Sequence, residues 1–178
     1  DLDSAVQPDD RRKQVIGKLL KLKPRQTTTL LQLAESLYLS APTVGGILRE
    51  VSPWFEERSL KIASIRSKGV CLVGDEYNFR IAIKDYMIEL MPEVLEALLS
   101  SYASGVDISR VRRIVLEAEN AWRIELADNS FKMVWIMACL SLARRSKAGK
   151  FIQAKEEDIQ NYNEYSFSES IYQRIEKE

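Results

Sequence analysis

Two helix starts that lie eleven residues apart constrain the fold of this chain more than any other feature. Thr29 is followed three residues later by Gln32, which is the pattern of a capping box, and Ser40 is of a type that caps a second helix. Apolar residues follow each start at helical spacing, namely Leu30, Leu33, Ala34 and Leu37 in the first helix and Val44, Ile47, Leu48, Val51 and Phe55 in the second. The pattern therefore predicts two helices separated only by a tight turn.

A further helix is expected before this pair, and a β-hairpin is expected after it. From Arg11 to Leu22 the apolar residues recur at helical spacing, and Pro24 ends the run. The segment 60–73 is rich in Ile, Val and Leu and is interrupted by Arg66-Ser67-Lys68-Gly69, which is typical of a hairpin with a basic tip. Three helices with a tight turn between the last two, followed by a hairpin, predict a winged helix-turn-helix domain over residues 11–76.

The remaining residues, 77–178, are predicted to form an all-α helical bundle. Helices are expected from about Asn78, between Pro92 and Gly105, from Asp107 and from Asp128, and a last helix contains Phe167, Ile171 and Ile175. The expected fold class is therefore mainly α, with a winged helix-turn-helix followed by a helical bundle.

The chain is neutral overall, but its charge is unevenly distributed. It has 26 Lys and Arg and 26 Asp and Glu residues. Residues 11–80 hold thirteen basic and six acidic residues, a net charge of +7 that the rest of the chain offsets. A basic section within a neutral chain indicates one part that binds a polyanion and one part with another role.

The composition argues against an enzyme. Histidine, the commonest general base and metal ligand, is absent, and no glycine-rich phosphate-binding motif is present. Cys71 and Cys139 lie 68 positions apart on apolar segments, so we expect buried thiols in a reducing compartment. No apolar run approaches the roughly 20 residues of a spanning helix. We therefore expect a cytoplasmic protein that is not an enzyme, with no cofactor, no metal and no membrane partner.

The outer face of the third helix is expected to contact DNA, because in this fold its polar face lies in the major groove. The inward stripe leaves Pro42, Thr43, Gly45, Gly46 and Arg49 on that face. Only Arg49 is a long donor for base edges, while Thr43 can contact a phosphate or a thymine methyl. Each interior glycine costs about 1 kcal/mol relative to alanine. Two explanations for these glycines remain open. Either the helix backbone closely approaches DNA or another helix, or the module keeps its fold but no longer recognises DNA sequence strongly.

Phosphate contacts are expected from two basic groups, for which an ordinary solvated surface is the alternative. The first group is on the hairpin and comprises Lys61, Arg66 and Lys68, and the second is at the first helix and comprises Arg11, Arg12 and Lys13. The expected partner of both groups is double-stranded operator DNA.

The order of these motifs resembles the winged helix that precedes the phosphotransferase-system regulation domain (PRD) in transcriptional activators of the mannitol-operon type. The matching stretches are "LAESLYLS" and "KGVCLVGDEYNFR" in the winged helix, and "IELADNSFKMVWIMACLSLARRSKAGKFI" and "NEYSFSESIYQRIE" in the later helices. The resemblance covers about residues 11–178. It implies a sugar-responsive bacterial regulator that is dimeric and is controlled by histidine phosphorylation through the sugar phosphotransferase system.

The resemblance also places the family's first phosphorylatable histidine at Ala138, which cannot accept a phosphoryl group. We expect the regulation domain to be truncated at its C-terminus, so that this chain is a fragment of a longer regulator. The expected function is the DNA-binding and regulatory portion of a transcriptional regulator of sugar-utilisation genes, without a phosphorylatable histidine. Its expected partners are operator DNA, a second copy and, through the full-length regulator, phosphotransferase-system proteins. The alternative is a protein-interaction or dimerisation module whose degenerate winged helix does not read DNA.

Overall fold

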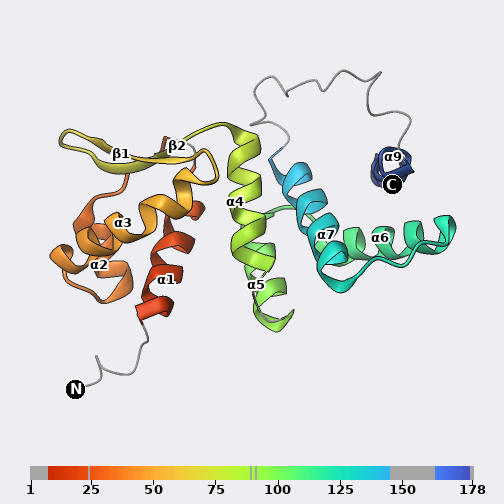
Figure 1. Cartoon of the computed structure of the whole chain (residues 1–178), viewed down its shortest axis with the longest axis horizontal. Helices are drawn as coiled ribbons and strands as arrows, with labels where there is room; N and C mark the ends of the chain where they lie inside the picture. The colour runs from red at the N-terminus through yellow and green to blue at the C-terminus, as the bar shows by residue number, and fades with distance from the viewer. Residues whose placement is uncertain (1–7, 24, 89, 91, 145–162, 177–178) are drawn as a thin grey trace. The chain divides into compact units, whose positions relative to one another are not determined.

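The computed structural model describes residues 8–23, 25–88, 90, 92–144 and 163–176. Within these residues the chain forms eight helices and one antiparallel hairpin (Figure 1), which confirms the predicted fold class of a winged helix followed by helices. The chain divides into two compact units between Tyr86 and Met87, and each is described by itself. None of the helices in the described ranges has both the length and the apolar character needed to cross a membrane.

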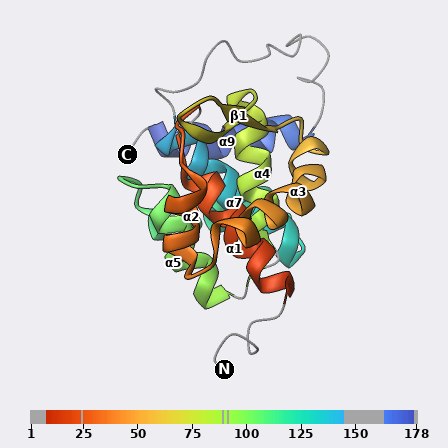
Figure 2. The same cartoon turned by 90° about the vertical axis from the view of Figure 1, so that its left-hand side faces the viewer.

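The first unit contains the elements that the sequence predicts for a winged helix. These are α1 (Pro8–Lys21), α2 (Leu30–Leu37), α3 (Ala41–Glu56), β1 (Lys61–Ile65), β2 (Gly69–Val73) and most of α4 (Glu76–Ile88). The hairpin of β1 and β2 lies above α1 and α2 in both views (Figures 1 and 2).

Local hydrogen bonds explain where α2 and α3 begin. At the start of α2 the Gln32 N–H donates to Thr29 Oγ1 at 3.1 Å, and the Thr29 N–H donates to Gln32 Oε1 at 2.9 Å. Each bond satisfies a backbone donor that has no partner within the helix. At the start of α3 the Thr43 N–H donates to Ser40 Oγ at 3.2 Å. Both predicted caps are therefore confirmed.

The core of the first unit is built from one face of each helix. All five inward residues predicted for α3 are buried, and Val44 and Phe55 have no exposed surface. They pack with α1, whose buried residues include Leu19 and Leu20, and with α2, whose buried residues are Leu33 and Ala34. A fully buried Leu or Phe side chain stabilises a fold by about 1.5–3 kcal/mol. This packing holds α3 with its opposite face toward solvent.

Strand β2 forms a two-stranded sheet with β1 and is bridged to Thr28 on its other edge. It pairs with β1 in antiparallel register, so that Lys61 lies opposite Val73 and Ile65 opposite Gly69. On its other edge the Thr28 and Val70 backbones exchange two hydrogen bonds of 2.8 Å. Because β2 is paired on both edges, the hairpin is anchored to the segment that leads into α2.

The second unit is helical in its described residues. Its helices are α5 (Pro92–Tyr102), α6 (Ile108–Trp122), α7 (Asp128–Ala143) and α9 (Asn163–Glu176). Asp107 caps α6 as predicted, because its Oδ1 accepts the Arg110 N–H at 2.9 Å. Helix α7 is capped by Ala127 without a side-chain hydrogen bond, and Asp128 is its first helical residue.

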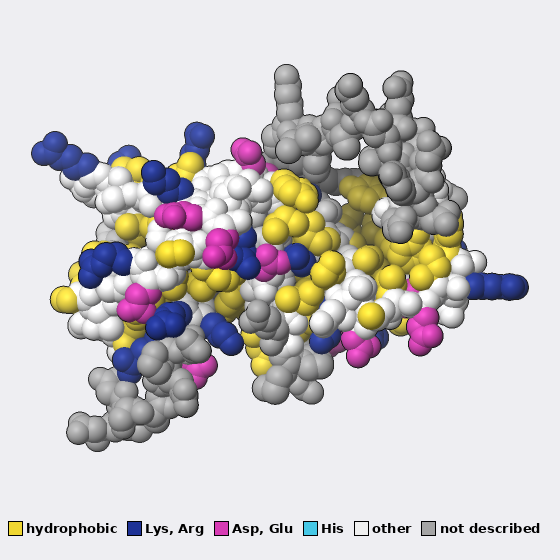
Figure 3. Space-filling model, in the orientation of Figure 1, with side chains coloured by type: hydrophobic (Ala, Val, Ile, Leu, Met, Phe, Trp, Pro, Cys, Tyr) yellow, Lys and Arg dark blue, Asp and Glu magenta, His cyan; other side chains and the backbone are white. Residues whose placement is uncertain are grey.

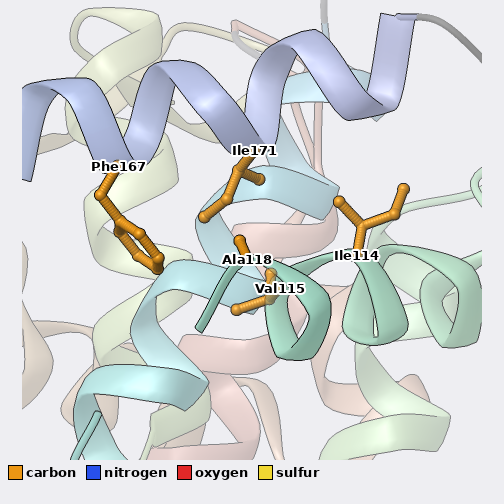
Figure 4. Close-up of a cluster of buried hydrophobic side chains, with 5 residues drawn as sticks. All are labelled: Ile114, Val115, Ala118, Phe167 and Ile171. Carbon is orange, nitrogen blue, oxygen red and sulfur yellow. The ribbon is translucent and has the colours of Figure 1, made fainter. Parts of the chain in front are cut away.

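Helix α9 packs on α6 through a cluster of buried apolar side chains. Figure 4 shows Phe167 and Ile171 of α9 directed toward Val115 and Ala118 of α6, and Ile114 belongs to the same cluster. The predicted burial of both thiols is confirmed: Cys71 in β2 and Cys139 in α7 are free and buried. Burial raises the pKa of the Cys139 thiol to about 12.

Candidate nucleic-acid interface

The turn between α2 and α3 fixes the start of α3. Tyr38 ends α2 in the left-handed backbone region, with φ 54° and ψ 40°, and the Leu39 N–H donates to Ala34 O at 2.9 Å. Two residues after Tyr38, Ser40 caps α3, and its hydroxyl lies 2.7 Å from the hydroxyl of Thr43. The turn is therefore as short as the sequence predicts, and the first residues of α3 are held by their own side chains.

The outer face of α3 is open to solvent. Pro42, Thr43 and Arg49 are exposed, and Gly45 and Gly46 are partly exposed. Within the described part of the chain, the side chain of Arg49 makes no hydrogen bond or ion pair. Its guanidinium is therefore available to an outside partner, and it has the planar shape that can pair with two acceptors on a guanine edge.

The two glycines of α3 leave a bare strip on this face. A Cβ atom built on Gly45 or on Gly46 would have no atom within 4 Å, outside the neighbouring residues and the backbone of the same helix. The packing of the described residues therefore gives no reason for glycine at either position.

The basic residues of α1 lie beside α3, but they are not equivalent. Arg12 and Lys13 are exposed, whereas Arg11 is partly buried. Arg12 Nε lies 2.8 Å from Glu50 Oε2, and Glu50 directly follows Arg49 on α3. Since both partners are about half exposed, a pair of this kind contributes at most about 1 kcal/mol. It places the Arg12 guanidinium next to the outer face of α3, with its charge compensated by the carboxylate.

The three basic residues of the hairpin fall at two places. Arg66 and Lys68 lie at the tip, where the Lys68 N–H donates to Ile65 O at 3.0 Å. Lys61 opens β1 at the base of the hairpin, four residues before Ile65, which is roughly 13 Å along a strand. All three side chains are exposed. Figure 3 shows Lys and Arg side chains that project from the end of the first unit that carries the hairpin.

Two exposed residues near this surface were not singled out from the sequence. Tyr38, in the turn before α3, is 94% exposed. Arg25 is also exposed, has a φ of 62°, and its N–H donates to Leu72 O at 3.3 Å, which places it beside β2. No signal in the sequence predicts the exposure of Tyr38, because a tyrosine near two apolar stripes is usually buried. Nothing in the local sequence pattern places Arg25 beside the sheet.

A shallow depression between the end of α3 and α4 is a weaker candidate for a binding site than the outer face of α3. Its basic side chain, Arg58, lies over the Trp54 ring at 3.9 Å from the centroid. The Arg58 Nε also lies 2.8 Å from Asp85 Oδ2, so that the end of α3 is tied to α4. Among the described residues no group of three or more Cys, Asp or Glu could hold a metal ion. We assign no ligand to this depression.

The position that the resemblance gives to the phosphorylatable histidine lies in the second unit. Ala138 is partly buried on α7, next to Cys139. One turn earlier, Trp135 Nε1 donates to Ile108 O at 2.8 Å, and the Arg112 guanidinium lies 6.0 Å from the Trp135 ring centroid. A methyl group at position 138 has no nucleophilic atom.

Comparison with known families supports a DNA-binding role for the first unit. Residues 14–87 match the family model described as the Mga helix-turn-helix domain. This domain belongs to regulators that contain PRD domains, and the match does not single out the mannitol-operon type. The match covers 74 of 178 residues, so it describes the first unit and not the whole chain. A search of curated proteins finds no match to the chain.

Proposed function

We propose that residues 11–76 form a winged helix-turn-helix domain that binds double-stranded operator DNA for a bacterial transcriptional regulator. Helix α3 docks in the major groove with its outer face, and the hairpin and α1 contact phosphates. The proposed contacts are Thr43, Gly45, Gly46 and Arg49 on α3, Lys61, Arg66 and Lys68 on the hairpin, and Arg11, Arg12 and Lys13 on α1.

One observation carries this proposal. The segment that matches a helix-turn-helix family presents α3 with a buried inner face, a capped start and an open outer face on which Arg49 is unengaged within the described residues. The sixteen residues of α3 span about 24 Å, and a helix with side chains is about 10–12 Å wide. The major groove is about 12 Å wide, so α3 has the dimensions to enter it.

Most of the affinity is expected to come from phosphate contacts. The outer face of α3 offers Arg49 as its one long donor among the residues proposed there, whereas the hairpin and α1 supply six basic side chains. Each neutralised phosphate releases condensed counterions, so binding weakens as salt rises. The module therefore binds DNA with a steep salt dependence and a modest base preference.

The proposed roles beyond DNA binding depend on the resemblance to activators that contain a PRD and on the residues of the chain. Residues 77–178 act as a PRD-like regulatory domain of an activator of sugar-utilisation genes, which works in the cytoplasm as a homodimer. Phosphotransferase-system proteins act on the full-length regulator. Histidine phosphorylation takes place outside residues 1–178, because these residues include no histidine and the family's first histidine position is Ala138.

A second candidate is a protein-interaction or dimerisation module that does not read DNA. Two exposed apolar side chains favour it: Leu31 of α2 is 61% exposed, and Tyr38, in the turn after α2, is 94% exposed. The two candidate functions differ in the salt dependence of binding. DNA binding weakens as salt rises because it releases condensed counterions, whereas apolar contacts between proteins release none.

Fluorescence anisotropy of labelled duplex DNA, at two salt concentrations, tests the proposed function. The probes are a duplex selected by the whole chain from a random-sequence library and an unselected random duplex, and sedimentation gives the association state in parallel. Salt-sensitive binding that favours the selected duplex is the expected result. A folded dimer without affinity for either duplex would support the second candidate and refute the first.

A further inference from the structure

The glycines of the first unit differ in what the fold requires of them. A Cβ on Gly17 would lie 2.5 Å from the Tyr86 hydroxyl oxygen, and one on Gly74 would lie 2.4 Å from Leu60 Cδ2. Gly69 has a φ of 96°, and a Cβ there would meet the Thr28 backbone. Packing or backbone conformation therefore explains glycine at each of these three positions.

Gly45 and Gly46 have no such explanation in the described structure. Both lie within α3, and a Cβ on either would enter open space. An interior glycine destabilises a helix relative to alanine, because it loses more backbone freedom on folding. Two adjacent glycines in a helix of sixteen residues therefore carry a stability cost that no contact in the described residues requires.

The residues around the strip indicate what approaches it. Thr43 and Arg49, which flank the two glycines in the sequence of α3, are both exposed. The section 11–80 that contains α3 carries a net charge of +7, which complements a polyanion. Since residues 14–87 match a helix-turn-helix domain, the occupant with the chemistry to fit this face is double-stranded DNA.

We infer that Gly45 and Gly46 allow the backbone of α3 to lie directly against the base edges of the major groove, closer than a Cβ at either position would permit. This inference rests on the proposed function and adds the mode of contact. Of the two explanations that the sequence leaves open for these glycines, it favours close approach of the α3 backbone to DNA. Specificity then arises from shape and from apolar contact with thymine methyl groups, with Arg49 as the polar contact.

Alanine substitutions separate this role from a structural one. Gly45→Ala and Gly46→Ala are each expected to increase the folding equilibrium constant about fivefold, because alanine favours the helix. Each is expected to weaken binding to the library-selected duplex about tenfold, which is the size of one lost base contact. The slope of affinity against salt stays unchanged, since neither glycine carries a charge.

Ser100→Ala is the matched control. Ser100 is exposed on α5 in the second unit, so the substitution removes a surface hydroxyl, leaves a methyl group there and also favours a helix. It is expected to leave DNA binding unchanged. The assay uses the whole chain, with urea unfolding measured beside anisotropy for every variant.

The outcomes distinguish this inference from the proposed function. If the unsubstituted chain binds DNA and both glycine variants bind with the same affinity, the close approach is refuted and the proposed function stands. If the unsubstituted chain does not bind DNA, the proposed function fails and this inference fails with it. If the glycine variants lose self-association while they keep their DNA affinity, the strip contacts a second copy and the inference is overturned.

Discussion

The hairpin depends on Gly69, and replacing this glycine with alanine tests why. Gly69 has a φ of 96°, and a Cβ there would lie 2.1 Å from Thr28 O and 2.7 Å from Thr28 C. A non-glycine residue in a left-handed conformation costs about 1–2 kcal/mol. Forcing an extra carbon into a packed site typically costs about 1–3 kcal/mol. Gly69→Ala should therefore lower the free energy of unfolding of the first unit by about 2–5 kcal/mol.

Amide hydrogen exchange locates this loss. The N–H groups of Thr28 and Val70 donate to each other's carbonyl oxygens at 2.8 Å, so their exchange reports the opening of the bridge between β2 and the segment before α2. Both amides should exchange faster in Gly69→Ala, while Gly46→Ala, which adds its methyl to open space, should slow exchange slightly. Equal protection in the two variants would refute the argument from close backbone contact.

Three further predictions concern single side chains. Ser40→Ala removes the acceptor of the Thr43 N–H and should lower the unfolding free energy by about 1 kcal/mol, whereas Ser40→Asp retains an acceptor and should leave this free energy unchanged. Identical urea unfolding of the two variants would contradict this cap. In competition binding, Arg49→Ala should reduce base preference by about 1–3 kcal/mol, and Lys68→Ala should weaken binding to all sequences alike and lower the salt slope by about one. Unchanged affinity in both would disprove the docking geometry. Burial raises the pKa of the Cys139 thiol to about 12, so iodoacetamide at about pH 8 should alkylate Cys139 only when urea unfolds the chain. Mass spectrometry measures this modification, and rapid alkylation of the folded chain would argue against the burial.

Local patterns in the sequence were sufficient to predict the helix starts of the first unit. Thr29 and Ser40 accept the backbone N–H groups that their spacing predicts, because a cap depends only on residues within one turn. The inward stripe of α3 was equally predictable, since a period of 3.6 residues fixes one face of a helix.

Contacts between distant residues were not predictable in the same way. The bridge of Thr28 to Val70 and the pair of Arg12 with Glu50 join residues 42 and 38 positions apart. No periodic pattern encodes such partners, because they depend on how the elements pack. The predicted phosphate contact at Arg12 therefore gains a neighbouring carboxylate that only the folded chain reveals.

The candidate interface itself could be predicted only in part. The outer residues of α3 follow from the stripe that they oppose, and the basic hairpin tip follows from its composition. The exposure of Tyr38 could not be derived, because a tyrosine near two apolar stripes is usually buried. The absence of neighbours around Gly45 and Gly46 was also invisible in the sequence, and it is this absence that separates them from the glycines that packing requires.

Glycine-selective ¹⁵N labelling of the whole chain, followed by titration with the library-selected duplex, tests the central claim most directly. The chain has seven glycines, so the spectrum contains few signals, and Gly45 and Gly46 report on α3 while Gly105 reports on the second unit. Docking of α3 predicts that the Gly45 and Gly46 amide signals shift most and that the Gly105 signal does not move. A duplex that binds while the Gly45 and Gly46 signals stay in place would contradict the account.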